Sequence, residues 1–344
     1  MDQIASRSKE DRISIFSESA NRRGVLPQII EKDFWVCWTL DKLFALPEVS
    51  PHLIFKGGTS LSKVYGVIAR FSEDIDVSIN RKYLGFEGDA DPLNISGTNK
   101  RKNAVEGIKE ACRTKVQGPL LTQLHDLFSQ GLVGEEWSLE IDDSDKDGQT
   151  LLFSFPQTSE SDAGKALRYV KPLIRIELGA RAEHQPFEVR TIRPYAAEDF
   201  PKLFSNPECE IKVLAAERTF WEKATILHDQ HHRSADDKTA ERISRHYYDL
   251  YMLAQTPIAE RALNDRALLE NVVENKKVFF TRSAARYDEA LTGHLRLVPK
   301  PERMAALNAD YSKMDEMFFS TPPPMKEILD LLAELEERIN SEFK

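Results

Sequence analysis

Residues 52–79 read HLIFKGGTSLSKVYGVIARFSEDIDVSI. The first four residues are a short apolar run, which predicts a strand, and Gly57-Gly58 after it predicts a tight turn. Either Thr59 or Ser60 could cap a short helix that reaches to about residue 65. From 73 to 79 polar and apolar residues alternate, which predicts a second strand. This stretch therefore predicts a strand, a helix and a strand, joined by a turn rich in glycine and hydroxyl side chains.

The second predicted strand carries two carboxylates on one face. Asp74 and Asp76 are two residues apart, so their side chains point the same way and can share a divalent cation. Glu177, on a strand predicted near 169–178, is a candidate third ligand on an adjacent strand. Such carboxylates would form a two-metal site, which activates an attacking oxygen and neutralises a leaving pyrophosphate. Glycines beside hydroxyl residues at a helix start would let backbone N–H groups approach a triphosphate. The pattern predicts phosphoryl transfer from a nucleoside triphosphate.

Each part of this pattern has an ordinary structural explanation when it is taken alone. An Asp-x-Asp on an edge strand is more often a solvated face, and Gly-Gly-Thr-Ser is more often a plain turn. Glu177 stands close in sequence to Arg175 and Arg181 and could simply be ion-paired. It is the combination, in this order and on these elements, that favours a nucleotide-transfer site.

The regions on either side extend the pattern to a whole chain. Helices are predicted over 8–24, 27–46 and about 100–130, and strands near 136–142, 149–155, 169–178 and 187–194, with a polar turn at 156–165. After Pro207 the strand pattern disappears, and helices are predicted over 211–228, 240–255, 258–292, 301–318 and 325–342. We therefore expect an α+β fold with two domains, a mixed domain over 1–205 and a helical domain over 206–344.

The composition excludes several classes of protein. A length of 344 residues fits about two domains, at about 150 residues each. The net charge of −9 argues against a protein that coats nucleic acid. Cys37, Cys112 and Cys209 lie far apart with no CxxC pair, which fits a reducing cytosol better than a disulfide or zinc framework. No signal sequence or long apolar span is readable, so we expect a cytoplasmic protein without a membrane segment.

Several motifs together resemble a known family. Phe55–Lys63 followed by Arg70–Asp76 resembles the AbiEii/AbiGii-type nucleotidyltransferase toxins of the DNA-polymerase-β-like nucleotidyltransferase superfamily. Glu31–Val36 is similar to the N-terminal signature of this family, and Glu217–Lys223 with Arg245–Leu250 resembles its C-terminal helical motif. The resemblance spans about 25–255. It implies a polymerase-β-like nucleotidyltransferase core, a mixed sheet flanked by helices, with a C-terminal helical bundle.

The resemblance also implies roles for individual residues. The implied metal ligands, for Mg²⁺ or Mn²⁺, are Asp74, Asp76 and Glu177. The implied triphosphate-binding residues are Gly57, Gly58, Thr59, Ser60, Lys63 and Ser72. The implied catalytic residues are the three carboxylates with Lys223, which would neutralise phosphate charge, and Asp249, which would orient Lys223 or act as a base. Arg70 stands just before the metal-binding strand, where a basic residue is common in this family. Residues 80–150 do not align with the family pattern.

The implied function is that of a toxin in a bacterial toxin–antitoxin or phage-defence system. Such an enzyme transfers a nucleoside monophosphate from an NTP to an acceptor hydroxyl, with a tRNA 3′ end as the expected acceptor. A cognate antitoxin is expected from a neighbouring gene. Three alternatives stay open: a nucleotidyltransferase or kinase-like enzyme that modifies proteins, a small-molecule (antibiotic) nucleotidyltransferase, and an inactive NTP-binding regulator.

Three further features have both a functional and a structural interpretation. Residues 99–115 contain six Lys or Arg and only two Glu, so this segment has a net positive charge. It is predicted to be either a surface that follows the phosphates of an RNA or the solvated face of a helix. His228-Asp229 with His231-His232 predicts a metal cluster or, more simply, a solvated loop. Tyr247, Tyr248 and Tyr251 could stack on a base, although tyrosines at helical spacing more often belong to the core.

Overall fold

The computed structural model describes residues 1–158, 172–234, 237 and 241–342. It divides the chain into two compact units. The first comprises Met1–Val64 and Phe71–Val213, and the second comprises Tyr65–Arg70 and Leu214–Lys344. The short segment Tyr65–Arg70 therefore packs with the C-terminal part of the chain, although both of its sequence neighbours belong to the first unit.

A mixed sheet forms the centre of the first unit. Within the described residues it has the strand order β3-β4-β5-β2-β1-β7-β6. Its strands are β1 (Leu53–Lys56), β2 (Ile75–Ile79), β3 (Ser138–Ile141), β4 (Thr150–Ser154), β5 (Ile174–Gly179), β6 (Phe187–Ile192) and β7 (Cys209–Leu214). β1 is antiparallel to β2 and parallel to β7, and β2 is parallel to β5. β4 is antiparallel to both β3 and β5. This architecture confirms the predicted α+β class.

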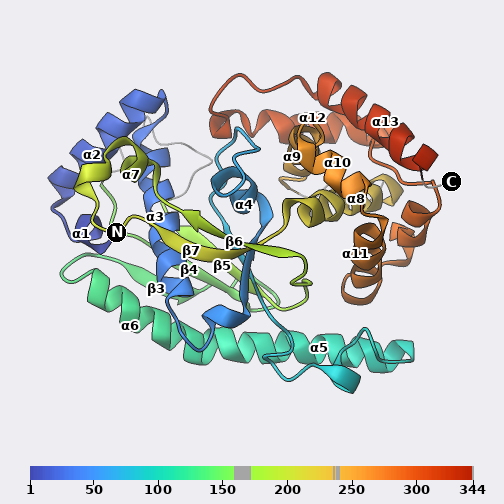
Figure 1. Ribbon diagram of the computed structural model, residues 1–344, viewed down its shortest axis with the longest axis horizontal. Helices are drawn as coiled ribbons and strands as arrows, with labels where there is room; N and C mark the ends of the chain where they lie inside the picture. Colours follow the sequence, from blue (N-terminus) through green and yellow to red (C-terminus); the bar gives the residue numbers. More distant parts are fainter. Residues whose placement is uncertain (159–171, 235–236, 238–240, 343–344) are drawn as a thin grey trace. The chain divides into compact units, whose positions relative to one another are not determined.

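Helices accompany the sheet in the described part of the first unit. They are α1 (Asp2–Ala5), α2 (Lys9–Arg23), α3 (Pro27–Phe44), α4 (Gly57–Lys63), α5 (Thr98–Lys115), α6 (Leu121–Gly131) and α7 (Tyr195–Asp199). α4 contacts β1 and β2, while α3 and α5 both contact β5 (Figure 1). The predicted helix over 100–130 is two helices. Gly118 leaves helical geometry, and Pro119 lacks the N–H that a continuous helix would need.

An aromatic cluster fills the core between α3, α6 and the sheet. The rings of Trp38 and Phe128 have centroids 4.7 Å apart, as do the rings of Phe128 and Phe153. Trp35 packs edge-on against Phe153 at 6.0 Å. These side chains are fully buried, which accounts for the long helical apolar pattern read over 27–46.

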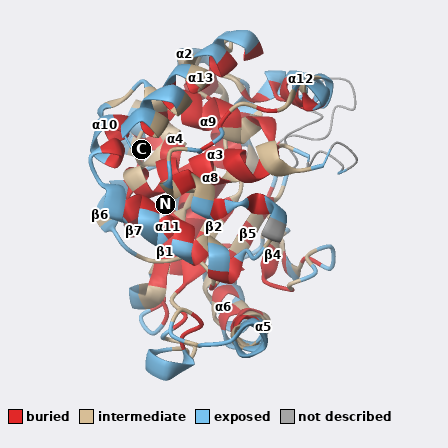
Figure 2. Cartoon of the chain, turned by 90° about the vertical axis from the view of Figure 1, so that its right-hand side faces the viewer, coloured by how far each residue is buried: buried red, intermediate tan, exposed pale blue. Residues whose placement is uncertain are grey.

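One sequence prediction was wrong near the end of the sheet. Residues 211–214 were expected to begin a helix, but Cys209–Leu214 forms β7, and its helix starts at Ala216. Cys209, Ile211 and Val213 alternate with Glu210 and Lys212, and this period-two pattern buries the apolar side chains beside β1. The two compact units divide between Val213 and Leu214, at the end of β7. β6 is the edge strand beyond β7, and most of its residues are exposed (Figure 2).

The second unit is helical, as its sequence predicted. Its helices are α8 (Ala216–His232), α9 (Ser244–Ala254), α10 (Pro257–Leu263), α11 (Arg266–Phe279), α12 (Met304–Ser312) and α13 (Met325–Glu342). α8 contacts α9, α10 and α11, and α9 also contacts α12 and α13. The predicted helix over 258–292 is broken after Leu263 and again after Phe279. Among the described residues, no helix is long and apolar enough to cross a membrane. Of the predicted elements, residues 159–165, 169–171 and 240 lie outside the described residues.

Candidate active site

The register of the sheet brings the predicted carboxylates together. β2 and β5 run parallel, and Asp76 lies directly opposite Glu177. Asp74 immediately precedes β2, and its charge acts on Glu177 together with that of Asp76. The side chains of Asp76 and Glu177 are 24% and 43% exposed, so both are accessible to solvent. We call Asp74, Asp76 and Glu177 the acidic centre.

The acidic centre concentrates negative charge. Burial and the charges of Asp76 and Asp74 raise the pKa of Glu177 to about 7. Two cations lie nearby at loose distances. Arg175 Nε is 3.5 Å from Glu177 Oε1, and Lys56 Nζ is 4.0 Å from Asp76 Oδ1. These ion pairs leave like charges crowded together, which is the electrostatic situation that a bound divalent cation relieves.

The glycine turn approaches the acidic centre closely. α4 begins at Gly57, directly after the last residue of β1. Gly57 has a φ of +79°, and a Cβ atom at this position would lie 2.0 Å from Asp76 Oδ2. Only glycine fits there, for both conformational and steric reasons. The sequence could show the glycine but not the close approach, since the partner follows 19 residues later.

The hydroxyl side chains of the turn are bonded within it. Thr59 Oγ1 donates to the carbonyl oxygen of Asp74 at 2.5 Å and lies 2.9 Å from Ser72 Oγ. Ser60 Oγ donates to the carbonyl oxygen of Gly57 at 2.8 Å. Thr59 and Ser60 are buried. Their hydroxyl groups therefore fix the turn beside the acidic centre, which leaves backbone groups of Gly57-Gly58 as the predicted approach to a phosphate.

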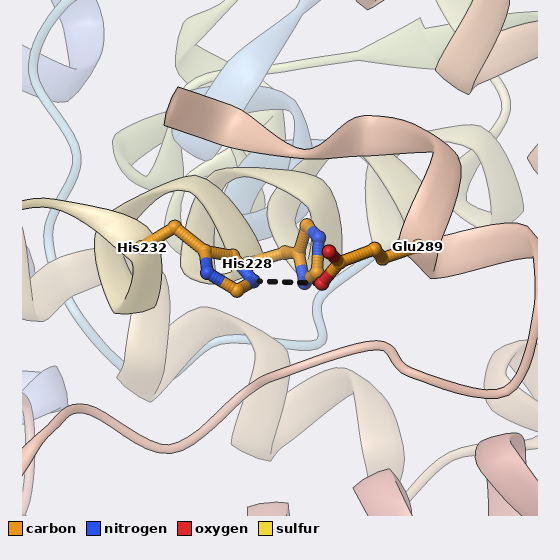
Figure 3. Close-up of side chains that lie close together, drawn as sticks. All are labelled: His228, His232 and Glu289. Atoms are coloured by element: carbon orange, nitrogen blue, oxygen red, sulfur yellow. Dashed lines mark ion pairs between the residues drawn. The ribbon is translucent and has the colours of Figure 1, made fainter. Parts of the chain in front are cut away.

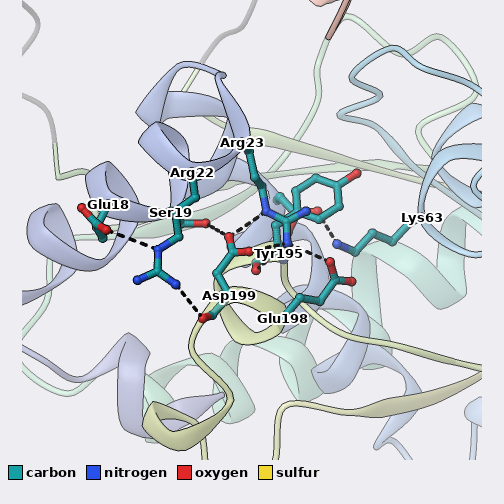
Figure 4. Close-up of polar contacts among 9 residues, drawn as sticks. Glu18, Ser19, Arg22, Arg23, Lys63, Tyr195, Glu198 and Asp199 are labelled. Atoms are coloured by element: carbon teal, nitrogen blue, oxygen red, sulfur yellow. Dashed lines mark hydrogen bonds and ion pairs between the residues drawn. The ribbon is translucent and has the colours of Figure 1, made fainter.

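Lys63 lies in the interior of the first unit. Its Nζ is 2.6 Å from Asp33 Oδ1 and 3.6 Å from the centroid of the Tyr195 ring, and Figure 4 shows it directed toward Tyr195. Both charged side chains are 5% exposed. Although burial opposes it, the charge of Asp33 raises the pKa of Lys63 above its usual value. These contacts anchor α4 to α3 and do not bring Lys63 to the acidic centre.

Three charged residues of α3, Glu31, Lys32 and Asp33, bind other segments of the first unit. Lys32 Nζ lies 2.6 Å from Glu73 Oε2, and both side chains are almost fully buried. Glu31 Oε1 accepts a hydrogen bond from the backbone N–H of Thr158 at 2.7 Å. Together with Asp33 these residues tie α3 to segments that flank the acidic centre. The sequence showed only that these residues resemble a family motif. It could not show their contacts, because the partner residues are distant along the chain.

The other two predicted catalytic residues form a buried network in the second unit. Asp249 Oδ2 lies 2.7 Å from Lys223 Nζ and 2.8 Å from Arg70 Nη2, and Asp249 Oδ1 lies 2.8 Å from Arg70 Nε. The side chains of Asp249, Arg70 and Lys223 are 0%, 1% and 7% exposed. Against the effect of burial, Arg70 and Lys223 lower the pKa of Asp249 strongly. A carboxylate held in this way orients its partners and is poorly suited to accept a proton. We call Arg70, Lys223 and Asp249 the buried network.

A histidine cluster at the end of α8 has a structural role. His228, His232 and Glu289 place ligand atoms within 4.8 Å of one another (Figure 3). However, the backbone N–H of Arg296 donates to His228 Nδ1 at 2.9 Å, so Nε2 carries the proton and donates to the carbonyl oxygen of Arg286 at 3.1 Å. Both ring nitrogens of His228 are thus occupied. The geometry favours the structural interpretation, although the cluster is packed and not in a solvated loop.

The tyrosines of α9 belong to the core, and two of them also border a cavity. Tyr247, Tyr248 and Tyr251 are all buried, and Tyr248 and Tyr251 line a cavity of about 560 Å³ within the second unit. Phe318 packs edge-on against Tyr248, with ring centroids 5.0 Å apart. The hydroxyl group of Tyr251 is hydrogen-bonded to Glu327. The sequence did not indicate this cavity, because Phe318 and Glu327 are about 70 residues from the tyrosines.

The basic segment on α5 is partly neutralised. Lys109 pairs with Glu106 at 3.2 Å and with Asp147 at 3.4 Å. Arg113 pairs with Glu110, and Arg101 donates to the carbonyl oxygen of Ile95. These contacts support the solvated-helix interpretation for this part of α5.

Comparisons with known proteins identify a family for the chain. A family model described as nucleotidyl transferase AbiEii toxin, type IV toxin–antitoxin system, matches residues 38–335. Among solved structures, MenT4, a nucleotidyltransferase toxin from Mycobacterium tuberculosis H37Rv, is similar with a TM-score of 0.47 and 16% sequence identity. That similarity covers 96% of this chain and 99% of MenT4. Among curated proteins, none matches the chain. The residues that the family model matches lie in both units.

Proposed function

The chain belongs to the AbiEii family of nucleotidyl transferase toxins of type IV toxin–antitoxin systems, and from this premise we propose that the acidic centre transfers a nucleoside monophosphate from an NTP to an acceptor hydroxyl. The predicted resemblance to this family is thereby confirmed, and the chain is a nucleotidyltransferase toxin. The observation that carries the proposal is the parallel register that sets Asp76 beside Glu177, with Asp74 two residues before Asp76.

The donor atoms of the acidic centre fit a divalent cation. All are carboxylate oxygens, the ligands that Mg²⁺ and Mn²⁺ favour. Burial and the charges of Asp76 and Asp74 raise the pKa of Glu177, although Arg175 and Lys56 lie 3.5 and 4.0 Å from carboxylate oxygens of the centre. Asp74, Asp76 and Glu177 would hold the cation. Once bound, the cation would supply charge neutralisation for the triphosphate and for the leaving pyrophosphate.

The remaining steps depend on the chain's own residues. An acceptor oxygen attacks the α-phosphorus of the NTP. The bond from that phosphorus to the oxygen that bridges the α- and β-phosphates breaks, and pyrophosphate leaves. The proton of the acceptor hydroxyl passes to solvent. The missing side chain of Gly57 leaves room for Asp76, and the backbone N–H groups of Gly57 and Gly58 are proposed to approach a phosphate. Thr59, Ser60 and Ser72 keep the turn in place. Lys223 is proposed to neutralise phosphate charge, with Asp249 orienting it through their 2.7 Å contact.

The proposed acceptor is the 3′ end of tRNA. What supports this acceptor is the pair of exposed basic side chains on α5, Lys100 and Lys102, which would contact its phosphates. An antitoxin partner and NTP use follow from the family, while the acceptor and the identity of the metal belong to this proposal.

The test compares NTPs labelled at the α- or the γ-phosphate. The protein is incubated with Mg²⁺ and each label, together with total tRNA or with cell extract freed of RNA. We expect only the α-label to enter a product, and that product to be tRNA. Transfer of the γ-label would identify a kinase-like reaction, and α-label found only on protein would reject the tRNA acceptor.

A further inference from the structure

The segment Tyr65–Arg70 connects the two motifs of the proposed active site along the chain. It follows α4, which contains the glycine turn, and it ends four residues before Asp74. Nevertheless it packs in the second unit. Only a short stretch of chain separates this segment from the metal-binding strand. The contacts that fix the segment therefore also restrict the position of the strand.

The backbone of the segment is held by contacts within the second unit. The hydroxyl group of Tyr65 donates to the carbonyl oxygen of Leu214 at 3.0 Å. The backbone N–H of Ala69 donates to Tyr248 Oη at 3.2 Å, and the carbonyl oxygen of Ala69 accepts from the N–H of Phe319 at 3.2 Å. Arg70 itself forms an antiparallel bridge with Phe318. The segment is thus fixed at both ends and along its backbone.

The Arg70 side chain adds the strongest of these contacts. Its guanidinium group makes two parallel bonds of 2.8 Å to Asp249, and this geometry is specific to arginine. Both side chains are buried, so solvent does not screen the pair. Lys223 bonds the same carboxylate from α8 and limits its movement. The end of the segment is therefore set by a rigid charged contact.

The chain beyond Arg70 is equally fixed in the first unit. Ser72 and the carbonyl oxygen of Asp74 contact Thr59, and Glu73 pairs with Lys32. The chain from Arg70 to Asp74 is thus held by contacts at both of its ends and has little conformational freedom. We propose that Arg70 is a positioning residue, which holds the approach to Asp74 through its bidentate contact with Asp249 and so sets the geometry of the metal-binding carboxylates. This inference rests on the proposed function of the acidic centre.

The test measures the affinity of the protein for Mn²⁺ alone by electron paramagnetic resonance, so it does not depend on activity. We compare wild type, R70Q, R70K, D76N and the control R218K. Arg218 is a matched control because it is also a buried arginine of the second unit, and its contacts include those with Glu222 and Asn271. Thermal unfolding of each variant shows that it is folded at the temperature of the titration.

We expect D76N to bind Mn²⁺ much more weakly than wild type and R218K to bind as wild type. R70Q and R70K should weaken binding by about 10-fold or more, as is typical when the supports of metal ligands are lost. R70K keeps the charge and provides the measurement if R70Q does not fold. Wild-type affinity in a folded R70K or R70Q, with weak binding in D76N, overturns this inference alone. Equal Mn²⁺ binding by wild type and D76N overturns the proposed metal site as well.

Discussion

The acidic centre and the buried network show two opposite arrangements of charged residues. Asp76 and Glu177 are partly exposed, and their nearest cations lie 4.0 and 3.5 Å away. Asp249 is fully buried and has cationic groups of Arg70 and Lys223 at 2.7 to 2.8 Å. In the first arrangement three carboxylates share cations that lie at longer distances, which suits the binding of a further cation. The second is closely paired and suits an anchor. The three carboxylates of the acidic centre and the pair Lys223 and Asp249 were all predicted to be catalytic, and these roles stay predictions.

The largest expected effect on stability comes from D249A. This variant removes the carboxylate shared by two buried cations, so we expect the free energy of unfolding to fall by about 3–5 kcal/mol. The measurement is urea denaturation followed by circular dichroism. D76N is the control from the acidic centre, and it should change the same quantity by less than about 1 kcal/mol, because its carboxylate is partly exposed. Equal losses in D249A and D76N would remove the distinction between the two groups.

A smaller effect is expected from G57A, which probes the close approach in the acidic centre. Alanine at this positive φ costs about 1–2 kcal/mol, and its Cβ would also displace Asp76. G24A is the matched control, since Gly24 has a φ of +66° with open space around its Cβ position. Both variants should lose stability, but only G57A should also lose Mn²⁺ affinity. If the two variants behave alike in the Mn²⁺ titration, Gly57 serves the turn only.

The smallest expected effect concerns the pH dependence of stability. Because the pKa of Glu177 is raised to about 7 in the folded protein, the folded state holds this proton more tightly than the unfolded state. The free energy of unfolding therefore falls as pH rises from the ordinary glutamate range to about 7. The effect should stay below about 1 kcal/mol, since solvent screens a partly exposed group.

E177Q isolates this contribution. In a chelating buffer, the thermal stability of E177Q relative to wild type should increase as the pH rises from the ordinary glutamate pKa to about 7. Added Mg²⁺ should reduce the difference by stabilising the wild-type acidic centre. If thermal stability depends on pH in the same way for wild type and E177Q, the pKa of Glu177 is not raised in the folded protein.

Local patterns in the sequence predicted most of the fold. The apolar spacing of α3, the alternation in β2 and the glycine turn are each patterns formed by residues that are close together in the sequence. β7 was missed because its apolar residues lead almost directly into the helical pattern that begins at Ala216. The break between α5 and α6 has a local signal, Gly118-Pro119, which the longer helical pattern concealed.

The candidate site was predictable in its residue types but not in their surroundings. Asp74, Asp76 and Glu177 could be grouped because alternation along a strand defines a face. The enclosure of Lys63 by Asp33, and the bond from Arg70 to Asp249, depend on partners 30 and 179 residues away. Burial decides whether a charged residue meets a ligand or another side chain, and burial of this kind arises only in the tertiary structure.

The most direct test of the central claim is nucleotide transfer by D76N and by a matched control, D89N. Asp89 is an exposed aspartate of the first unit, outside the acidic centre. Transfer from α-labelled NTP and release of pyrophosphate are measured with Mg²⁺ and total tRNA at equal concentrations of folded protein. We predict that D89N matches wild type and that D76N loses at least about 100-fold in both products. Wild-type transfer by folded D76N would contradict the assignment of catalysis to the acidic centre.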